Sequence, residues 1–283
     1  AYAGYMAKQM LAEEGIHIPM LTTLHGTDIT LVGNHPFYKP AVTFSINNSD
    51  VVTCVSNSLK ADTIRLFDVR REIEVVPNFI DTKKILQPIT DCQRKMLAAP
   101  DEKIITHISN FRKVKRIGDV IKIFHQIQKE VKSKLIMVGQ GPEREMAENL
   151  AADLGIADQV LFLGNSNEIE KILNYTDLFV LPSETESFGL AALEAMVQGV
   201  PVISSNTGGL PEVNRHAFSG LLSDVGNVEE MAANALEILK DEKTLHQFKE
   251  NARQQAALFD LYSVLPLYEE LYRKAIGATT ASL

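Results

Sequence analysis

The stretch "VLPSETESFGLAALEAM", residues 180–196, reads as a strand, a loop and a helix in immediate succession. We expect the helix to begin near Ser187 or Phe188, because the polar loop gives way there to a small-residue apolar segment. The backbone amides of Phe188, Gly189 and Leu190 are then first-turn donors without intrahelical partners, at the positive end of the helix dipole. The stretch therefore predicts an anion site, best suited to phosphate, and Gly189 leaves room for a ligand to approach the backbone.

Two carboxylates, Glu186 and Glu194, stand eight positions apart in this stretch. If both were helical, they would lie about 12 Å apart along the axis, at 1.5 Å per residue. The paired carboxylates of glycosidases are about 5 to 9.5 Å apart, so this spacing argues against two groups that flank one bond. We interpret the pair as holding two separated parts of an elongated ligand, a sugar and a ribose, with phosphate between them. The alternative is two ordinary solvated glutamates, which the loop and helix context disfavours.

Short β-branched or apolar runs alternate with longer amphipathic segments on both sides of this stretch, as in βαβ units with a parallel sheet. Three strands are expected before residue 80 and six after it, whereas residues 77–88 contain two prolines and suit an interdomain connection. We predict an α/β fold of two Rossmann-like domains. Residues 1–80 belong to the first, which is incomplete, 81–260 form the second, and 261–283 form a C-terminal helix that packs back toward the first.

Parallel sheets of this kind bind ligands beyond the carboxyl ends of their strands. The segment "HISNFRKVKRIGDV" follows the first strand of the second domain and places Arg112, Lys113, Lys115 and Arg116 within five residues. Such cations could neutralise a departing diphosphate. The alternative is a solvated basic turn that caps a helix, and the position after a strand favours the first interpretation.

Three further loops follow predicted strands. His25, in "TLHGTDIT", could polarise a sugar hydroxyl or take a proton, although a lone histidine in a polar loop is more often structural. Gly139 and Gly141, in "MVGQGPERE", either make a tight turn or let a nucleotide approach the backbone. The two glycines of "NTGGLPEV" are interpreted as a backbone requirement rather than a direct contact.

Composition narrows the class of partner. The chain of 283 residues has a formal net charge of −8, which leaves no broad basic field for nucleic acid or an anionic membrane. Cys54 and Cys92 lack disulfide or zinc spacing and fit a reducing cytoplasm. No apolar run approaches the ~18 residues of a transmembrane helix. Because metal-clamp, P-loop and zinc-hydrolase motifs are absent from the sequence, we expect neither a metal nor another cofactor.

Taken together, the motifs resemble the retaining GT-B glycosyltransferases of family 4. The resemblance rests on Glu186 and Glu194 with "ESFG", the basic loop, "GQGP", "NTGGLPEV" and "VPNFID", and it runs through nearly all of the chain. Three stretches, "TTLHGTDIT", "SDVVTCVSNSL" and "HISNFRKVKR", are similar to the branch that transfers N-acetylglucosamine from UDP-GlcNAc to a small hydroxy acid, L-malate, in the first step of bacillithiol synthesis.

This resemblance implies a role for each candidate residue. Glu194 would bind the ribose hydroxyls of UDP, Glu186 the donor sugar near its 3-hydroxyl, Lys115 the diphosphate, and His25 the sugar near the reacting carbon. Many family members carry an arginine where this chain has Asn110, and Arg112 is the candidate to replace it. The remaining residues expected at the nucleotide are Asn110, Gly139, Gly141, Ser187, Phe188, Gly189 and Leu190.

Two expectations concern the extent of the chain. Family members begin with a strand and a glycine-rich loop that residues 1–80 do not contain, so we expect about the first third of the family's chain to be missing. Exposed apolar surface on the incomplete sheet would favour a homo-oligomer. The rival hypotheses are a family 4 transferase with another donor or acceptor, and a form that binds nucleotide sugar without turnover.

Overall fold

The computed structural model describes residues 1–31, 33, 35–82 and 91–280, and the chain divides into two compact units. Unit 1 comprises Ala1–Phe79 and the chain from Phe259 onward, and unit 2 comprises Ile80–Leu258. Part of the predicted interdomain connection, residues 83–88, lies outside the described residues. Within the described part of the chain, no helix is long and apolar enough to cross a membrane.

Unit 1 contains a three-stranded parallel sheet in the order β1-β2-β3. Its strands are β1 (Leu21–Leu24), β2 (Val51–Cys54) and β3 (Ile73–Val75), which are the three predicted strands. Its helices are α1 (Tyr2–Glu13), α2 (Thr27–Thr30), α3 (Lys39–Asn47), α4 (Asn57–Leu66) and α14 (Leu261–Thr280).

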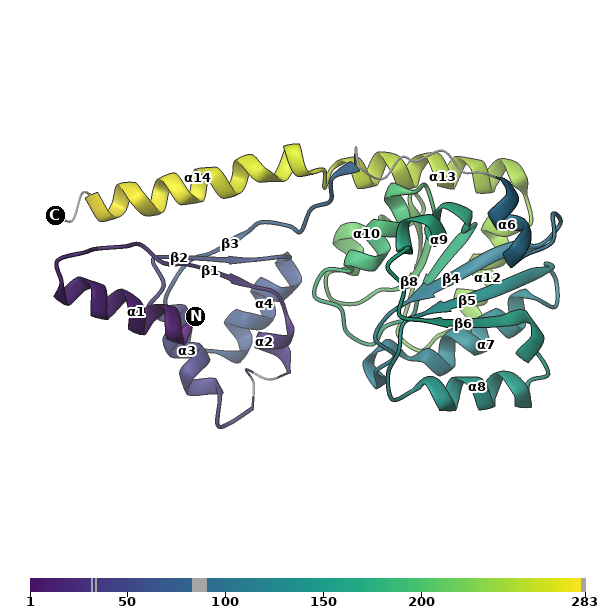
Figure 1. Ribbon diagram of the computed structural model, residues 1–283, viewed down its shortest axis with the longest axis horizontal. Coiled ribbons are helices and arrows are strands. Elements are labelled where there is room, and N and C mark those ends of the chain that lie inside the picture. Colours follow the sequence, from purple (N-terminus) through teal and green to yellow (C-terminus); the bar gives the residue numbers. More distant parts are fainter. Residues whose placement is uncertain (32, 34, 83–90, 281–283) are drawn as a thin grey trace. The chain divides into compact units, whose positions relative to one another are not determined.

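Helix α14 supplies three of the five buried residues of a small apolar cluster in unit 1. Its residues Val264, Leu271 and Ala275 are buried against Val51 and Val76 of the sheet region. The other helices of unit 1 lie on the opposite side of the three strands (Figure 1). Because this sheet is covered on both sides, β2 is buried at all four positions, as expected for a central parallel strand.

Unit 2 contains the six strands predicted after residue 80, all parallel. They are β4 (Lys103–Ile108), β5 (Ser133–Val138), β6 (Val160–Gly164), β7 (Leu178–Leu181), β8 (Val202–Ser205) and β9 (Gly220–Ser223). The α-helices are α6 (Asp91–Leu97), α7 (Ile117–Ile127), α8 (Arg144–Asp153), α9 (Ile169–Tyr175), α10 (Leu190–Val197), α11 (Leu210–Val213), α12 (Val228–Leu239) and α13 (Glu242–Ala257). Short 3-10 turns, η1 (Lys113–Lys115) and η2 (Ala157–Gln159), complete the unit.

The strand order in unit 2 is β6-β5-β4-β7-β8-β9, so the direction of winding reverses between β4 and β7. Helices α7, α8 and α12 bury a continuous apolar core on one face of the sheet, and α9, α10 and α13 lie on the other (Figure 1). This is the doubly wound order, and it confirms the predicted α/β class with parallel sheets. Ligands in such folds bind at the reversal point, which here is the carboxyl end of β4 and β7.

Asp177, the residue before β7, ties three elements of unit 2 together. One carboxylate oxygen accepts hydrogen bonds from the Ile104 amide at 3.0 Å and from Arg94 of α6 at 3.2 Å, and the other accepts one from Lys249 of α13 at 2.9 Å. Burial alone would raise the pKa of Asp177, but Lys249 and the Ile104 amide hold it below its ordinary value. The charged form is therefore the one that the fold stabilises.

We predict that Asp177→Asn lowers the free energy of unfolding by about 3 kcal/mol, because Lys249 and Arg94 lose their shared anion in a largely buried place. Urea unfolding at neutral pH measures the change. The matched control is Asp101→Asn, which removes a carboxylate from an exposed pair with Lys132 and should leave stability unchanged. Equal effects of the two substitutions would contradict the role given to Asp177.

Candidate functional site

The loops that leave β4 and β7 contact each other at the reversal point of the sheet. The Glu184 amide, after β7, donates a hydrogen bond of 2.8 Å to the Val114 carbonyl, after β4. This contact places the basic segment predicted at residues 112–116 beside the "ETESFG" loop. Two motifs about seventy residues apart in sequence therefore form one site.

Lys115 and Glu186 form an ion pair at the centre of this site. The Lys115 side chain is 20% exposed and that of Glu186 is 14% exposed, so the pair is largely shielded from water. The same Glu186 oxygen, Oε1, also accepts a hydrogen bond of 3.1 Å from the buried hydroxyl of Ser183. A carboxylate with both donors on one oxygen keeps its other oxygen available for a ligand.

The backbone of Glu186 is fixed by the loop after β8. The Gly209 amide donates to the Glu186 carbonyl at 2.9 Å, and a Cβ on Gly208 would lie 1.9 Å from that same carbonyl oxygen. A Cβ on Gly209 would lie 2.4 Å from the Ser187 carbonyl oxygen. Both positions of "NTGGLPEV" thus require glycine because another backbone segment approaches closely, which agrees with their interpretation as a backbone requirement.

Helix α10 begins at Leu190, so the predicted start near Ser187 or Phe188 is wrong by two or three residues. The reason is Gly189, whose φ of +98° lies outside the right-handed helical region and whose carbonyl accepts the first hydrogen bonds of the helix, from Ala192 and Leu193. The first helical amide is that of Leu190. Of the three predicted amides, those of Phe188 and Gly189 belong to the loop, and the Phe188 side chain is buried.

Glu194 lies on α10 in surroundings unlike those of Glu186. It lines a cavity of about 450 Å³ together with residues of the β6–α9 loop, α9 and α10, including Asn167, Glu170 and Gln198. Burial, and secondarily the charge of Glu170, raises the pKa of Glu194 above its ordinary value. Glu186 is not helical, so the helical distance assumed between the two carboxylates does not apply, but they do face different partners.

The cationic residues of the basic loop differ in their surroundings. Lys115 pairs with Glu186, and Arg116, which has a left-handed φ of 52°, turns to Asp119 at 2.6 Å. Arg112 and Lys113 are exposed, and so is the uncharged Asn110. The structure therefore brings only Lys115 of the predicted residues of this loop into direct contact with the "ETESFG" loop, while the place of Arg112 at the diphosphate stays a prediction.

Gly139 and Gly141 accommodate the protein's own backbone. Gly139 has a φ of +123°, and a Cβ there would lie 1.8 Å from the Ser109 carbonyl oxygen. A Cβ on Gly141 would lie 2.0 Å from the carbonyl oxygen of Asn110. Of the two interpretations of "GQGP", these contacts favour the tight turn.

His25 belongs to unit 1, whereas the other predicted site residues belong to unit 2. It is exposed after β1, and Asp28 accepts hydrogen bonds from the amides of His25 and Gly26 at 3.2 and 2.7 Å. Asp28 thus closes the turn after β1. The contact of His25 with a donor sugar stays a prediction.

Among residues 1–31, 33, 35–82 and 91–280, no group of three or more His, Cys, Asp or Glu side chains is placed to hold a metal ion. The polar groups gathered at the site are a lysine, a carboxylate, a buried hydroxyl and helix-terminal amides. Such a set can bind an anion beside a hydroxyl-bearing group.

Comparison with known proteins identifies the family. The family model "Glycosyl transferases group 1" matches residues 89–255, and the model "Glycosyltransferase Family 4" matches residues 1–84. The chain belongs to the group 1 glycosyltransferases. It is 42% identical over 274 residues to the N-acetyl-alpha-D-glucosaminyl L-malate synthase of Bacillus anthracis, an alignment that covers 96% of this chain and 71% of the relative.

Solved structures show that this glycosyltransferase has the GT-B fold. Sucrose-phosphate synthase from Thermosynechococcus elongatus matches with a TM-score of 0.82 and 24% identity, over 98% of this chain and 72% of that one. Alr3699/HepE of Anabaena, in complex with UDP, matches with a TM-score of 0.82 and 23% identity, over 100% of this chain and 76% of that one. The predicted fold, family and enzyme class are confirmed.

One polar residue near the site of this glycosyltransferase was not predicted: His107, a fully buried residue of β4. Its Nδ1 donates to the Val180 carbonyl of β7 at 2.8 Å, so Nε2 is the acceptor of a 2.8 Å hydrogen bond from the Ser109 hydroxyl. Ser109 Oγ in turn accepts from the Phe111 amide at 3.3 Å. This chain of hydrogen bonds joins β7 to the loop that carries Lys115, and the signal for it in the sequence is a histidine at an inner position of a predicted strand.

Burial, reinforced by Lys115, lowers the pKa of His107 from 6.5 to about 4. The folded protein therefore holds this histidine neutral. Between pH 6.5 and about pH 4, the unfolded chain binds a proton at this position and the folded protein does not. The contribution of His107 to the stability of the folded state is fully present above pH 6.5 and is lost as the pH falls toward 4. The free energy of unfolding decreases by about 3 kcal/mol over this range, at 1.36 kcal/mol per pKa unit.

We predict that His107→Asn reduces this dependence of stability on pH, since asparagine does not titrate. Urea unfolding at pH 7 and pH 4.5 measures it, as the difference between wild type and variant at each pH. The control is His246→Asn, which removes an exposed histidine from α13 and should retain the wild-type dependence. A wild-type dependence in His107→Asn would show that His107 is not the titrating group.

Proposed function

We propose that this glycosyltransferase moves N-acetylglucosamine from UDP-GlcNAc to L-malate with retention of configuration, in the first step of bacillithiol synthesis. The observation that carries the proposal is the 42% identity over 96% of the chain to an N-acetyl-alpha-D-glucosaminyl L-malate synthase. The arrangement of the site in unit 2 supports it, because separate places exist for a phosphate and for a hydroxyl-bearing group.

In this proposal the nucleoside and the diphosphate bind at different parts of the site. Glu194, in its cavity beside α9, accepts hydrogen bonds from the ribose hydroxyls. Lys115, with the amide of Leu190 at the start of α10, holds the diphosphate at the positive end of the helix. Glu186 accepts hydrogen bonds from the donor sugar through its oxygen that does not bind Ser183.

The transfer breaks the bond between the anomeric carbon and the β-phosphate oxygen, and forms a bond from the malate hydroxyl oxygen to the same face of that carbon. The leaving phosphate oxygen takes the proton of the malate hydroxyl. Charge that develops on this oxygen is stabilised by Lys115 and helix-terminal amides, so the proposal requires no metal or other cofactor. We place the reaction in the cytoplasm, which fits two cysteines without disulfide spacing.

We expect L-malate to be required for rapid UDP release when the chain is given UDP-GlcNAc. Release is measured by a coupled assay, with L-malate, with D-malate and with neither. Release only with another acceptor would keep a family 4 transferase but reject L-malate. UDP binding without release under any condition would favour a nucleotide-sugar binding form that does not turn over.

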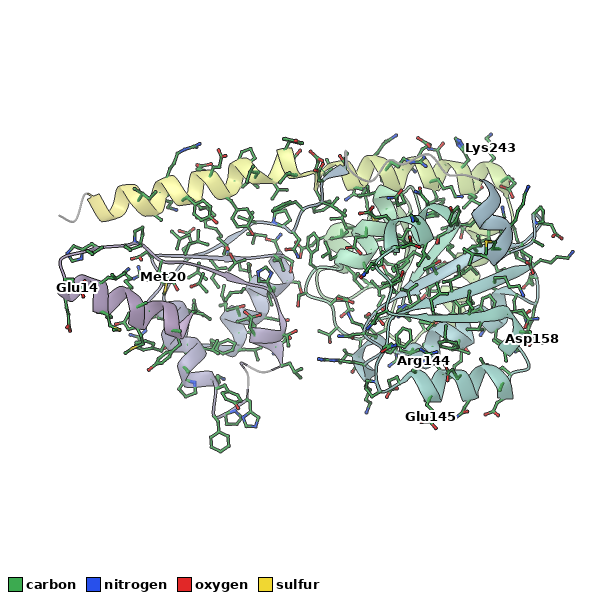
Figure 2. The ribbon with its side chains drawn as sticks, in the orientation of Figure 1. Glu14, Met20, Arg144, Glu145, Asp158 and Lys243 are labelled. Carbon is green, nitrogen blue, oxygen red and sulfur yellow. The ribbon has the colours of Figure 1, made fainter. Side chains whose placement is uncertain are left out.

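We predict that Glu194→Ala weakens UDP binding by about tenfold or more, because two hydroxyl hydrogen bonds to a carboxylate are lost. Isothermal titration with UDP measures the affinity. The control is Glu145→Ala, on α8, where the side chain projects away from the fold (Figure 2) and is exposed. Unchanged UDP affinity in Glu194→Ala would reject the assignment of this cavity to the ribose.

A further inference from the structure

The ion pair between Lys115 and Glu186 joins the two groups that the proposed function assigns to different parts of the donor. Lys115 is assigned to the diphosphate and Glu186 to the sugar, yet the structure has each as the counter-ion of the other. Both side chains are largely shielded from water. In such surroundings a charge that loses its partner must gain another, since its desolvation is not otherwise compensated.

A diphosphate that reaches Lys115 brings negative charge close to Glu186. The carboxylate cannot withdraw with its loop, because the backbone is held on both sides. The Glu184 amide binds the Val114 carbonyl at 2.8 Å, and the Gly209 amide binds the Glu186 carbonyl at 2.9 Å. Ser183 also anchors Oε1. Glu186 therefore competes with the diphosphate for Lys115 unless another donor satisfies the carboxylate.

We propose that Glu186 is a built-in competitor of the diphosphate, which weakens the binding of free UDP and so promotes release of this product. The proposal rests on the proposed function. While the donor sugar is present, its hydroxyls satisfy Glu186 and Lys115 turns to the diphosphate. When the sugar leaves with the acceptor, Glu186 loses those hydroxyls and takes Lys115 back from UDP.

The experiment compares UDP binding by wild type, Glu186→Gln and Lys115→Met, with the double substitution included. Glutamine keeps the shape of the side chain and its hydrogen bond from Ser183 but removes the competing charge. We expect Glu186→Gln to bind UDP about tenfold more tightly than wild type, because one unscreened negative charge near the phosphates is removed. In the Lys115→Met background the same substitution should give a much smaller gain, since the lysine for which Glu186 competes is absent.

Two controls separate this effect from general changes in charge or folding. Glu184→Gln removes an exposed carboxylate from the same loop and should leave UDP affinity within about twofold of wild type, as expected for a solvated charge. Uridine, which lacks phosphate, should bind wild type and Glu186→Gln equally, and its binding also reports that the Glu194 cavity is intact in each variant.

The outcomes distinguish the inference from the proposed function. Equal or weaker UDP binding by Glu186→Gln, with uridine binding intact, overturns the inference and leaves the proposed function standing. An equal gain for uridine, or for Glu184→Gln, also overturns it, since the effect would not be competition for Lys115. Failure of wild type to bind UDP at all overturns the proposed function and this inference together.

Discussion

Backbone-to-backbone contact between neighbouring loops is the constraint on which the site in unit 2 depends. Gly208 has no room for a side chain because the Glu186 carbonyl oxygen occupies the place of its Cβ, and Gly139 stands in the same relation to Ser109. Carbonyls and amides cannot be compressed as flexible side chains can, so the relative positions of these loops are fixed. Lys115 and Glu186 project from loops that hold each other in register, which is what a preorganised site requires.

The two carboxylates of the "ETESFGLAALEAM" segment differ chemically although one short stretch of chain carries both. Glu186 has a lysine and a hydroxyl on one oxygen, whereas burial, and secondarily the charge of Glu170, raises the pKa of Glu194 above its ordinary value. A carboxylate that lines a cavity can accept hydrogen bonds from vicinal hydroxyls. Glu186, which is paired with Lys115, suits the part of the site where a diphosphate would bind that lysine. The different roles proposed for Glu186 and Glu194 follow from the residues that surround each carboxylate.

Much of the fold could be predicted from sequence because a parallel sheet covered on both faces leaves a strong signal in its buried strands. The candidate site residues were predicted from their place after strands and before helices, and their roles stay predictions. Contacts across the fold left no such signal: the pairing of Lys115 with Glu186 depends on the strand order, and the late start of α10 depends on the φ of Gly189. Helix α13 leaves a weak apolar pattern in the sequence, because its buried face is mostly small or polar, as at Ala252 and Gln255. His107 was not predicted because the sequence of β4 does not reveal what a buried polar residue in the strand binds.

The C-terminal helix α14 completes a core whose other residues come from the first part of the chain. Cys54 ends β2, and Val264, the first core residue of α14, comes about 210 residues later. A ribosome that adds 5 to 20 residues per second needs roughly 10 to 40 s to cover that interval. During synthesis one face of the small sheet therefore stays uncovered for this time. Unit 2 lies before α14 in the chain, so it is synthesised in the same interval and can fold before α14 is complete. The larger unit should be the first to fold in the cell, and the core of unit 1 is complete only after its last helix has been synthesised.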